Sequence, residues 1–474
     1  MSASEICYLT ASQQRQKLLD GELSAREIMN AHLAQIERVN PKVNAVVTLL
    51  PERAIEGAAE ADEKQARGEE LGPLHGLPIA HKDLVETKGI RTTYGSPIYA
   101  DNVPEKNSLL IDRLQAAGAI TIGKTNTPEF GAGSQTFNPV FGATLNPYDT
   151  SKTCGGSSGG AAVALACGMI PIADGSDTGG SLRNPANFCN VVGFRPSPGR
   201  VPVWPAQMGW FPISVSGPMG RTVEDVALQL GVMAGPDSRC PISIEQPGDM
   251  FQQSLEIDFK GSRIAWSQDF GELPVDSRVT SAIDSQRSAF ESIGCEIVDD
   301  CPDFADADET FKAWRAWKFE HRFRPLLESH GDLIKDTIHW NCEAGRELTG
   351  PYLSTIEAKR TALFHRVREF LEDGNISFLI LPVSQVPPFN VDTPYISEIN
   401  GTKLETYIDW MKSCYYISAI GNPSISVPCG FTPEGLPVGV QIVGRHNNDL
   451  GVLQLAYAFQ QATEVWKHVP PVAE

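Results

Sequence analysis

The sequence has no hydrophobic run long enough to cross a membrane. Its longest nearly uninterrupted apolar stretch, 161–173, contains Gly168 and Pro171 and is shorter than the roughly 20 residues of a spanning helix. The N-terminal segment 1–24 lacks the basic region and apolar centre of a secretory signal. We therefore expect a cytoplasmic protein that makes no use of a membrane.

Cysteine and clustered basic charge are also scarce. The ten cysteines among 474 residues form no CxxC pair, and the nine histidines form no HExxH motif. This pattern argues against a disulfide framework and against a metal site, and it favours buried thiols in a reducing compartment. The chain has 39 Lys and Arg against 58 Asp and Glu, a net charge of −19, and no basic run exceeds two residues. We expect no metal, no cofactor and no directly bound nucleic acid.

The remaining composition is that of a large folded protein. Hydrophobic residues make up 41% of the chain, and its 42 glycines and 34 prolines are scattered without a repeat. These values exclude a disordered chain, a collagen and a coiled coil. Length alone allows two or three domains or one large one.

Helical and strand patterns alternate along the chain, which indicates an α/β fold with helices on both faces of a sheet. Ser24 and Glu27 have the spacing of a capping box at the start of the first long helix. Helices are expected at 22–40, 51–69, 109–117, 275–293 and 450–463, with 306–375 mostly helical. Strands are expected at 76–80, 120–123, 263–266, 295–298, 377–382, 423–427 and 439–443. Residues 125–160 are rich in Gly, Asn, Pro, Ser and Thr, and a loop of that length is often functional.

Three motifs have the residue types of a catalytic site. The first places Lys82 directly after the apolar strand 76–80, the second is Cys154-Gly-Gly-Ser-Ser-Gly-Gly160 before a small-residue helix, and the third is the Gly- and Ser-containing segment 175–183. The glycines allow close backbone approach to a ligand, and a helix that opens after such a loop presents N–H groups. Each motif also has an interpretation without catalysis: the first is a surface lysine at a strand end, the second a flexible linker, and the third an ordinary strand-to-helix turn.

Two other nucleophiles are compatible with parts of this pattern. Residues 155–159 match G-x-S-x-G, the serine elbow of α/β-hydrolases, but that elbow follows a strand and here 146–153 is loop-like. Cys154 or Cys189 could serve a Glu-Lys-Cys amidase, although burial is the commoner explanation for an isolated cysteine. We rank both hypotheses low.

Taken together, the three motifs resemble the amidase signature family. The matching residues are the lysine of GLPIAHKD, both serines of CGGSSGGAAVALA and the block GSDTGGSLRNPANFCNVVGFRPSPGRV, in the family's order and spacing. Weaker resemblance extends from about residue 5 to 465. The resemblance implies a large, mixed, twisted central sheet covered by helices on both faces. It also implies one domain over 1–474, with an N-terminal helical region (about 1–70) and a helical insertion (about 306–375).

The resemblance implies a Ser–cis-Ser–Lys triad. By position, Ser181 is the nucleophile, Ser157 is the bridging serine after a cis peptide bond, and Lys82 is the base. The family's oxyanion hole corresponds to the backbone N–H groups of Thr178, Gly179, Gly180 and Ser181. A lysine can act as a base only when neutral, so Lys82 needs a dry pocket that lowers its pKa from about 10.4.

Other residues of these segments are expected to support the site. Ser158, Asp177 and Arg183 are interpreted as structural support through loop hydrogen bonds and a buried ion pair. Phe130, Gly131 and Ser134 are the candidates for the substrate pocket wall, since the family places this loop beside the nucleophile. Six aromatic residues could also line an apolar pocket, but core packing is the preferred interpretation for each of them: Trp204, Trp210, Phe211, Trp314, Trp317 and Trp340.

The implied activity is hydrolysis of a small-molecule aliphatic or aryl carboxamide to a carboxylate and ammonia or an amine. One alternative is the catalytic A subunit of a glutamine-dependent tRNA amidotransferase. Here 193–200 reads GFRPSPGR, where those subunits read closer to GLKPTYG, and this departure favours a free amidase. A non-catalytic binding protein on the same fold is a third option, which the intact Lys82, Ser157 and Ser181 oppose. The expected partner is the amide substrate, with a homodimer as one option for assembly.

Overall fold

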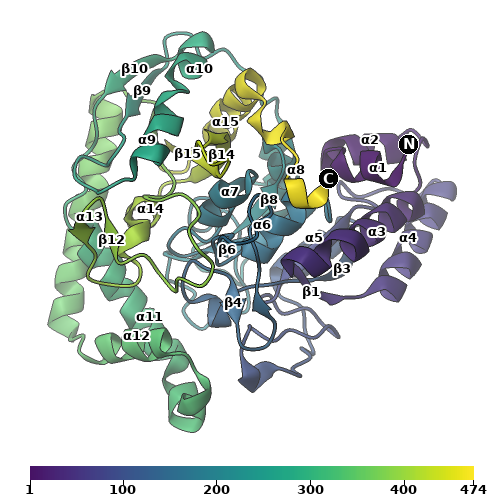
Figure 1. Cartoon of the computed structure of the whole chain (residues 1–474), viewed down its shortest axis with the longest axis horizontal. Helices are drawn as coiled ribbons and strands as arrows, with labels where there is room; N and C mark the ends of the chain where they lie inside the picture. Colours follow the sequence, from purple (N-terminus) through teal and green to yellow (C-terminus); the bar gives the residue numbers. More distant parts are fainter.

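A mixed sheet of eleven strands runs through the centre of the computed structural model, which describes residues 1–474 (Figure 1). From one edge to the other the strands are β1 (Val46–Leu49), β3 (Ile120–Thr125), β2 (Pro78–Lys82), β6 (Ile172–Asp177), β8 (Val215–Gly220), β7 (Val192–Arg195), β14 (Ser424–Phe431), β15 (Pro437–Gly444), β11 (Phe378–Pro382), β9 (Arg263–Trp266) and β10 (Glu296–Asp299). β2 is parallel to both β3 and β6, whereas β6 is antiparallel to β8. The predicted α/β class with a large mixed sheet is confirmed.

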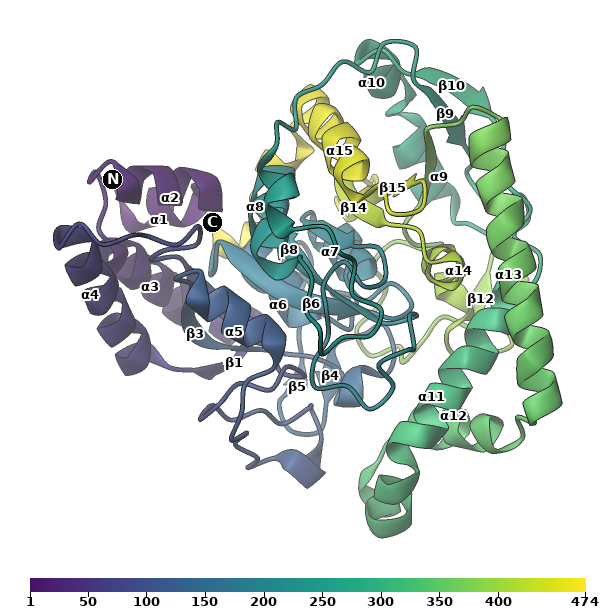
Figure 2. The ribbon, with the colours of Figure 1, turned by 180° about the vertical axis from the view of Figure 1, so that it is seen from behind.

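Helices cover both faces of this sheet and extend from its two ends (Figures 1 and 2). The helices at the β1 end are α1 (Ala3–Tyr8), α2 (Ala11–Leu19), α3 (Ala25–Val43), α4 (Pro51–Ala66) and α5 (Leu109–Ala116). Those over the centre and the β10 end are α6 (Gly159–Ala166), α7 (Arg183–Cys189), α8 (Val223–Met233), α9 (Ser277–Asp284), α10 (Arg287–Ser292), α14 (Lys412–Ile420) and α15 (Asp449–Thr463). The long helices α11 (Ala307–His330), α12 (Asp336–Arg346) and α13 (Gly350–Asp373) lie at the opposite end of the molecule from α1–α4 (Figure 1).

Two small hairpins lie outside the large sheet. One pairs β4 (Phe137–Asn138) with β5 (Gly142–Ala143), and the other pairs β12 (Glu398–Ile399) with β13 (Thr402–Lys403). No helix combines the length and the apolar composition that crossing a bilayer requires.

Local sequence signals account for several of these elements. The predicted capping box at the start of α3 is confirmed, because Ser24 Oγ accepts from Glu27 N at 3.1 Å and Ser24 N donates to Glu27 Oε2 at 2.8 Å. The predicted end of this helix at residue 40 is wrong. Pro41 lies inside α3, which continues to Val43 and ends at the left-handed Asn44.

Other predicted boundaries also need correction. The helix expected over 275–293 is two helices, α9 and α10, and the helix expected over 51–69 ends at Ala66. The strand expected to end at residue 80 continues to Lys82, so this lysine belongs to the strand itself. The sequence patterns do not predict eight of the larger elements: β1, β6, β7, β8, α1, α2, α8 and α14.

The hydrophobic interior consists of two clusters. The larger contains 104 residues and connects the N-terminal helices, the sheet and the C-terminal helix α15. A separate cluster of seven residues joins the loop around Phe130 to α11 and α12 through Phe319 and Phe323. This small aromatic cluster lies beside the candidate site described next.

Candidate active site

Lys82 is the last residue of β2, and its side chain is fully buried. Its Nζ donates to Ser157 Oγ and Ser158 Oγ at 2.8 Å each and approaches Ser176 Oγ at 3.3 Å. No carboxylate forms an ion pair with this amine. Strand β6 and the segment that leads into α6 thus surround one lysine with three hydroxyl groups.

The environment of Lys82 favours its neutral form. Burial lowers the pKa of Lys82 to about 7, because the charged ammonium loses its hydration, and Asp174 and Asp177 only partly offset this effect. A neutral amine has two N–H donors and one lone pair, so it can donate to two of the three hydroxyls and accept a proton from the third. The geometry suits a general base at neutral pH.

Ser157 is held by the loop that precedes α6. The peptide bond between Gly156 and Ser157 is cis. The carbonyls of Gly155 and Gly156 accept from Thr136 Oγ1 and Ser134 Oγ, each at 2.8 Å. Ser157 is 2% exposed. The residues that precede Ser157 form a loop, and not the strand that a G-x-S-x-G elbow requires.

Ser181 lies in the turn between β6 and α7. It is 8% exposed, and its carbonyl accepts from Ser158 N at 3.2 Å, which joins the two serine segments through the backbone. No hydrogen bond connects the hydroxyls of Ser157 and Ser181 in this structure. The backbone N–H groups of Thr178, Gly179 and Ser181 have no acceptor within the protein.

Gly180 differs from its neighbours in this turn, because its N–H donates to Asp177 Oδ1 at 2.8 Å. Its φ is +118°, and an added Cβ would lie 2.5 Å from that of Cys414, so only glycine fits here. Of the four predicted oxyanion-hole positions, three therefore have a free N–H and one is engaged with Asp177.

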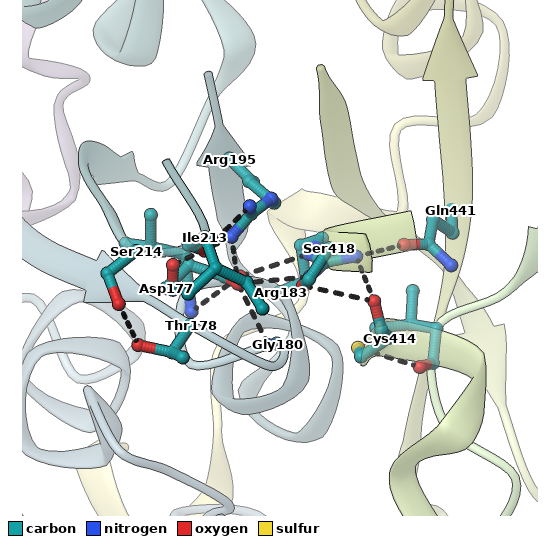
Figure 3. Close-up of polar contacts among 12 residues, drawn as sticks. Asp177, Thr178, Gly180, Arg183, Arg195, Ile213, Ser214, Cys414, Ser418 and Gln441 are labelled. Carbon is teal, nitrogen blue, oxygen red and sulfur yellow. Dashed lines mark hydrogen bonds and ion pairs between the residues drawn. The ribbon is translucent and has the colours of Figure 1, made fainter. Parts of the chain in front are cut away.

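A buried ion network fixes this turn (Figure 3). Asp177 accepts from Arg183 Nε and Nη2 at 3.0 Å each, and Arg195 Nη1 donates to the same carboxylate at 2.9 Å. Burial alone would raise the pKa of Asp177, but the two guanidinium groups hold that pKa well below its usual range. Arg183 also donates to Gln441 Oε1 and to the carbonyl of Cys414, which ties the turn to β15 and α14.

A pocket opens in front of Ser181. Its lining residues are Phe130, Gly131, Gly133, Thr178, Gly179, Ser181, Phe311, Arg315, Lys318, Phe319, Arg322, Phe323, Ile408 and Met411. Phe130 and Gly131 were predicted for this wall, and Gly131 also lies beside Ser157 Oγ. Ser134 lies behind the wall, bonded to the carbonyl of Gly156.

None of the six aromatic residues considered as alternative wall residues lines this pocket. Phe211 stacks on Trp314 with ring centroids 4.9 Å apart, and Trp210 is 77% exposed. The preferred interpretation of core packing is wrong for Trp210, Trp317 and Trp340, which are exposed.

The cysteine hypothesis lacks support in the geometry. Cys154 and Cys189 are both fully buried, and burial raises the pKa of Cys154 to about 12 and that of Cys189 well above its usual value. A thiol is nucleophilic only as the thiolate, and these environments disfavour the thiolate.

Sequence reasoning missed several polar residues of this region. Arg195 and Ser176 were not singled out, although both contact site residues. The basic residues Arg315, Lys318 and Arg322 were also missed. Their spacing of three and four places them on one face of a helix, which is a signal that the sequence contained.

Comparison with known proteins gives one consistent result. A family model described as Amidase matches residues 27–453. The chain is 35% identical to an acylamidase of Rhodococcus erythropolis, over 99% of this chain and 98% of that one. It is 34% identical to the A subunit of the glutamyl-tRNA(Gln) amidotransferase of Synechococcus sp. (strain CC9605), over 98% of both. The solved structure of a bacterial aryl acylamidase, described as an amidase signature enzyme, superposes with a TM-score of 0.91, at 28% identity and 98% coverage of both chains.

Proposed function

This chain belongs to the amidase (amidase signature) family, hydrolases of amide carbon–nitrogen bonds, and from that premise we propose that it cleaves a small-molecule carboxamide through an acyl-enzyme on Ser181. The observation that carries the proposal is the fully buried Lys82, which has no carboxylate partner and lies among three serine hydroxyls, one of them on Ser158, whose backbone N donates to the carbonyl of Ser181. A serine hydroxyl needs a base within reach to become nucleophilic, and a lysine with a pKa of about 7 can supply it.

The reaction begins with a proton relay. Neutral Lys82 accepts the proton of Ser157, and Ser157 accepts the proton of Ser181, whose hydroxyl turns toward it when substrate binds. Ser181 Oγ then attacks the amide carbonyl carbon and forms a tetrahedral oxyanion. The N–H groups of Thr178, Gly179 and Ser181, which have no acceptor within the protein, are the donors for that oxyanion.

Collapse of the intermediate breaks the carbon–nitrogen bond. The proton held by Lys82 returns through Ser157 to the nitrogen, which leaves as ammonia or an amine, and the acyl group stays on Ser181 as an ester. Water, activated by the same relay, adds to this ester and releases the carboxylate. No cofactor or metal is needed for these steps.

The substrate class follows from the pocket and the relatives. Phe130, Phe319 and Phe323 form an aromatic wall next to Ser181, with ring centroids 5.0 Å apart for Phe130–Phe323 and 5.2 Å for Phe319–Phe323. Relatives named acylamidase and aryl acylamidase are consistent with such a wall. We propose aliphatic and aryl amides as substrates, and a cytoplasmic location in which the ten cysteines stay unpaired.

The direct test locates the covalent intermediate. The purified protein is treated with a fluorophosphonate, and the modified peptide is identified by mass spectrometry. We expect the adduct on Ser181. We also expect Ser181→Ala to lower the kcat for an anilide by at least about a thousandfold, since residues of a catalytic unit have effects of this size.

Ser197→Ala is the matched control, because the Ser197 hydroxyl is buried, has no hydrogen-bond partner and lies outside the pocket. This variant should keep full activity and remain labelled on Ser181. An adduct on Ser157 would contradict the assignment and favour the serine-elbow hypothesis, and an adduct on a cysteine would favour the thiol hypothesis.

A second candidate function is that of the catalytic component of a tRNA amidotransferase, favoured by the 34% identity to such a protein. The two functions differ in what the isolated chain does. A free amidase releases ammonia or aniline from simple amides by itself, whereas the amidotransferase component would need its partner proteins. Amide hydrolysis that appears only when partner proteins are added would support the second function.

A further inference from the structure

Three basic residues of α11 line the pocket of Ser181. Arg315, Lys318 and Arg322 are separated by three and four positions, so they lie along one face of the helix and all reach the same cavity. The aromatic side chains Phe319 and Phe323 lie between them on the pocket wall. A proposed acyl or aryl group in this pocket would therefore meet positive charge as well as aromatic surface.

Arg315 is only 6% exposed, yet its direct partners are all neutral. Its guanidinium donates to Asn341 Oδ1 and, at 2.5 Å, to Tyr407 OH, and it lies 4.3 Å from the centroid of the Phe319 ring. Burial of a cation without a carboxylate costs free energy, which neutral hydrogen bonds and ring contacts offset only in part. An anion bound in the pocket would supply the negative charge that Arg315 lacks.

Lys318 extends the positive surface toward the nucleophile. Its Nζ donates to Ser214 Oγ, and that oxygen lies 2.7 Å from Thr178 Oγ1, beside the free N–H groups of the Ser181 turn. Burial lowers the pKa of Lys318 to about 7, and the nearby Arg322 and Arg315 contribute to this shift by repulsion. No acidic side chain pairs with Lys318, so an anion in the pocket would stabilise its charged form.

Two carboxylates, Glu129 and Glu86, lie near this surface but form no ion pair with its cations, and Glu129 Oε1 has no hydrogen-bond partner. Glu129 accepts from the backbone N of Lys335 at 3.1 Å, and Glu86 accepts from Tyr94 OH at 3.0 Å on the side of Arg322. The lysine at 335 is a further cation near Arg315. The pocket thus has an excess of positive charge in a chain whose net charge is −19.

Other cations of the same helix are paired with acids. Lys312 forms ion pairs with Asp308 and Asp409 at 3.0 and 2.8 Å, and Arg324 pairs with Glu320. The unpaired cations are therefore those that line the pocket. The basic residues of α11 thus lack acidic partners only where they line the pocket, and not along the whole helix.

We propose that Arg315, Lys318 and Arg322 bind an anionic group of the substrate, so that the preferred substrate is a carboxamide that also carries a carboxylate. This inference rests on the proposed amidase function and narrows its substrate class. The carboxylate binds between the guanidinium and ammonium groups while the amide carbonyl reaches Ser181, and the aromatic side chains contact the carbon skeleton between them.

The experiment compares substrates that differ only in charge. On the acyl side, glutaric acid mono-para-nitroanilide is compared with the neutral para-nitroanilide of pentanoic acid. On the amine side, para-acetamidobenzoate is compared with para-methylacetanilide. We expect kcat/KM to be at least about tenfold higher for the carboxylate member of one of these pairs. The pair with the larger ratio of the two kcat/KM values shows on which side of the amide the anion lies.

Variants then connect the preference to the three residues. Arg315→Met, Lys318→Met and Arg322→Met should each lower the charged-to-neutral ratio of kcat/KM by about threefold or more. Arg322 is exposed and Lys318 half-buried, so their variants test the inference even if loss of the buried Arg315 disturbs folding. Arg324→Gln removes one charge from the same helix outside the pocket and should leave the ratio unchanged.

A binding measurement separates this inference from the proposed function. Calorimetry with Ser181→Ala gives the affinities for the charged and neutral nitroanilides without turnover, and we expect at least about tenfold tighter binding of the charged one. Equal or weaker binding of the charged compound, or equal kcat/KM values within both pairs, would overturn the inference. Preferential binding with no turnover by the wild-type protein would instead contradict the amidase proposal alone.

Discussion

At residue scale, the proposed chemistry depends on keeping one lysine uncharged. Lys82 has three hydroxyl oxygens around Nζ and no ion-pair partner, while Asp177, at the end of the neighbouring strand, is neutralised by Arg183 and Arg195. If Asp177 were free to pair with Lys82, the ammonium form would be favoured and the base lost. The two arginines thus occupy one of the two carboxylates that raise the pKa of Lys82, and the other, Asp174, accepts from the backbone N of Lys82 at 3.3 Å.

The pH dependence of the reaction should report the titration of Lys82. The base works only when deprotonated, and its pKa is about 7, so kcat/KM for a neutral amide should rise from about pH 5.5, reach half its maximum near pH 7 and level off above about pH 8.5. A stopped assay of aniline release across this range measures it. A flat profile between about pH 6 and 9 would contradict a lysine base.

Lys318 also has a pKa of about 7 and lies in the same pocket, so the profile needs a control. Repeating the measurement in Lys318→Met distinguishes the two groups. If Lys82 is the base, the midpoint persists in this variant. A midpoint that disappears with Lys318 would assign the titration to the pocket cation instead.

At the scale of elements, β6 and α6 bring the two serine segments together. β6 places Asp177 and the Ser181 turn next to β2 and Lys82, and α6 begins two residues after Ser157. α6 is entirely buried and consists mainly of small residues, which lets it lie close to the segments that follow β3 and α3. Close backbone approach here fixes the position of Ser157 relative to Lys82.

Gly160 in α6 should be intolerant of a side chain. A Cβ at this position would lie 2.3 Å from Asn126 N and 2.7 Å from Ala45 O, both backbone atoms that cannot move independently. We expect Gly160→Ala to lower the free energy of unfolding by about 1–3 kcal/mol, the range for overpacking, and to reduce activity. Urea unfolding followed by circular dichroism measures the first effect.

Gly231→Ala is the matched control for this prediction. Gly231 lies in α8, and the nearest atom to an added Cβ is 3.5 Å away, an ordinary contact. Alanine should therefore stabilise the helix by up to about 1 kcal/mol. Equal effects of the two substitutions would show that backbone proximity at α6 is not limiting.

At the scale of the whole molecule, the proposed catalytic groups and the proposed substrate wall come from different parts of the chain. Lys82, Ser157 and Ser181 belong to the sheet and the elements next to it, whereas Arg315, Lys318 and Phe319 belong to α11. α11 and α13 nevertheless share the main hydrophobic cluster, and Arg360 of α13 donates to Ala419 O of α14 at 3.0 Å. The long helices are thus attached to the sheet firmly enough to position a pocket wall.

We predict that residues 1–474 form one domain and unfold together. The reason is the single cluster of 104 buried residues that links the N-terminal helices, the sheet and α13. Tryptophan fluorescence and far-ultraviolet circular dichroism should show coincident urea transitions. In hydrogen-exchange measurements in urea, the backbone amides of peptides 350–373 and 424–444 should lose their protection at the same denaturant concentration. Separate transitions would divide the chain into two domains.

Local interactions made part of this structure predictable from the sequence. The capping box of Ser24 and Glu27 and the apolar strand 377–382 depend on residues within a few positions of each other, and both form as expected. The motifs around Lys82, Ser157 and Ser181 also identified the family. The strand β6 was not predictable, because Asp174 and Asp177 read as loop residues until their basic partners are known.

The sequence by itself therefore determined the α/β class, the family and the residues that carry the proposed chemistry, because short motifs and local periodicity are enough to identify them. The tertiary structure decided which charges are neutralised. The ion pair of Asp177 with Arg183 was expected, because only six positions separate them, but the second partner Arg195 lies in β7, and Arg183 also reaches Gln441, 258 positions away. The same long-range packing left Arg315, Lys318 and Arg322 without acids at the pocket. Pairing between distant segments has no local signal, and here it leaves both the proposed base Lys82 and the proposed substrate-binding cations without carboxylate partners.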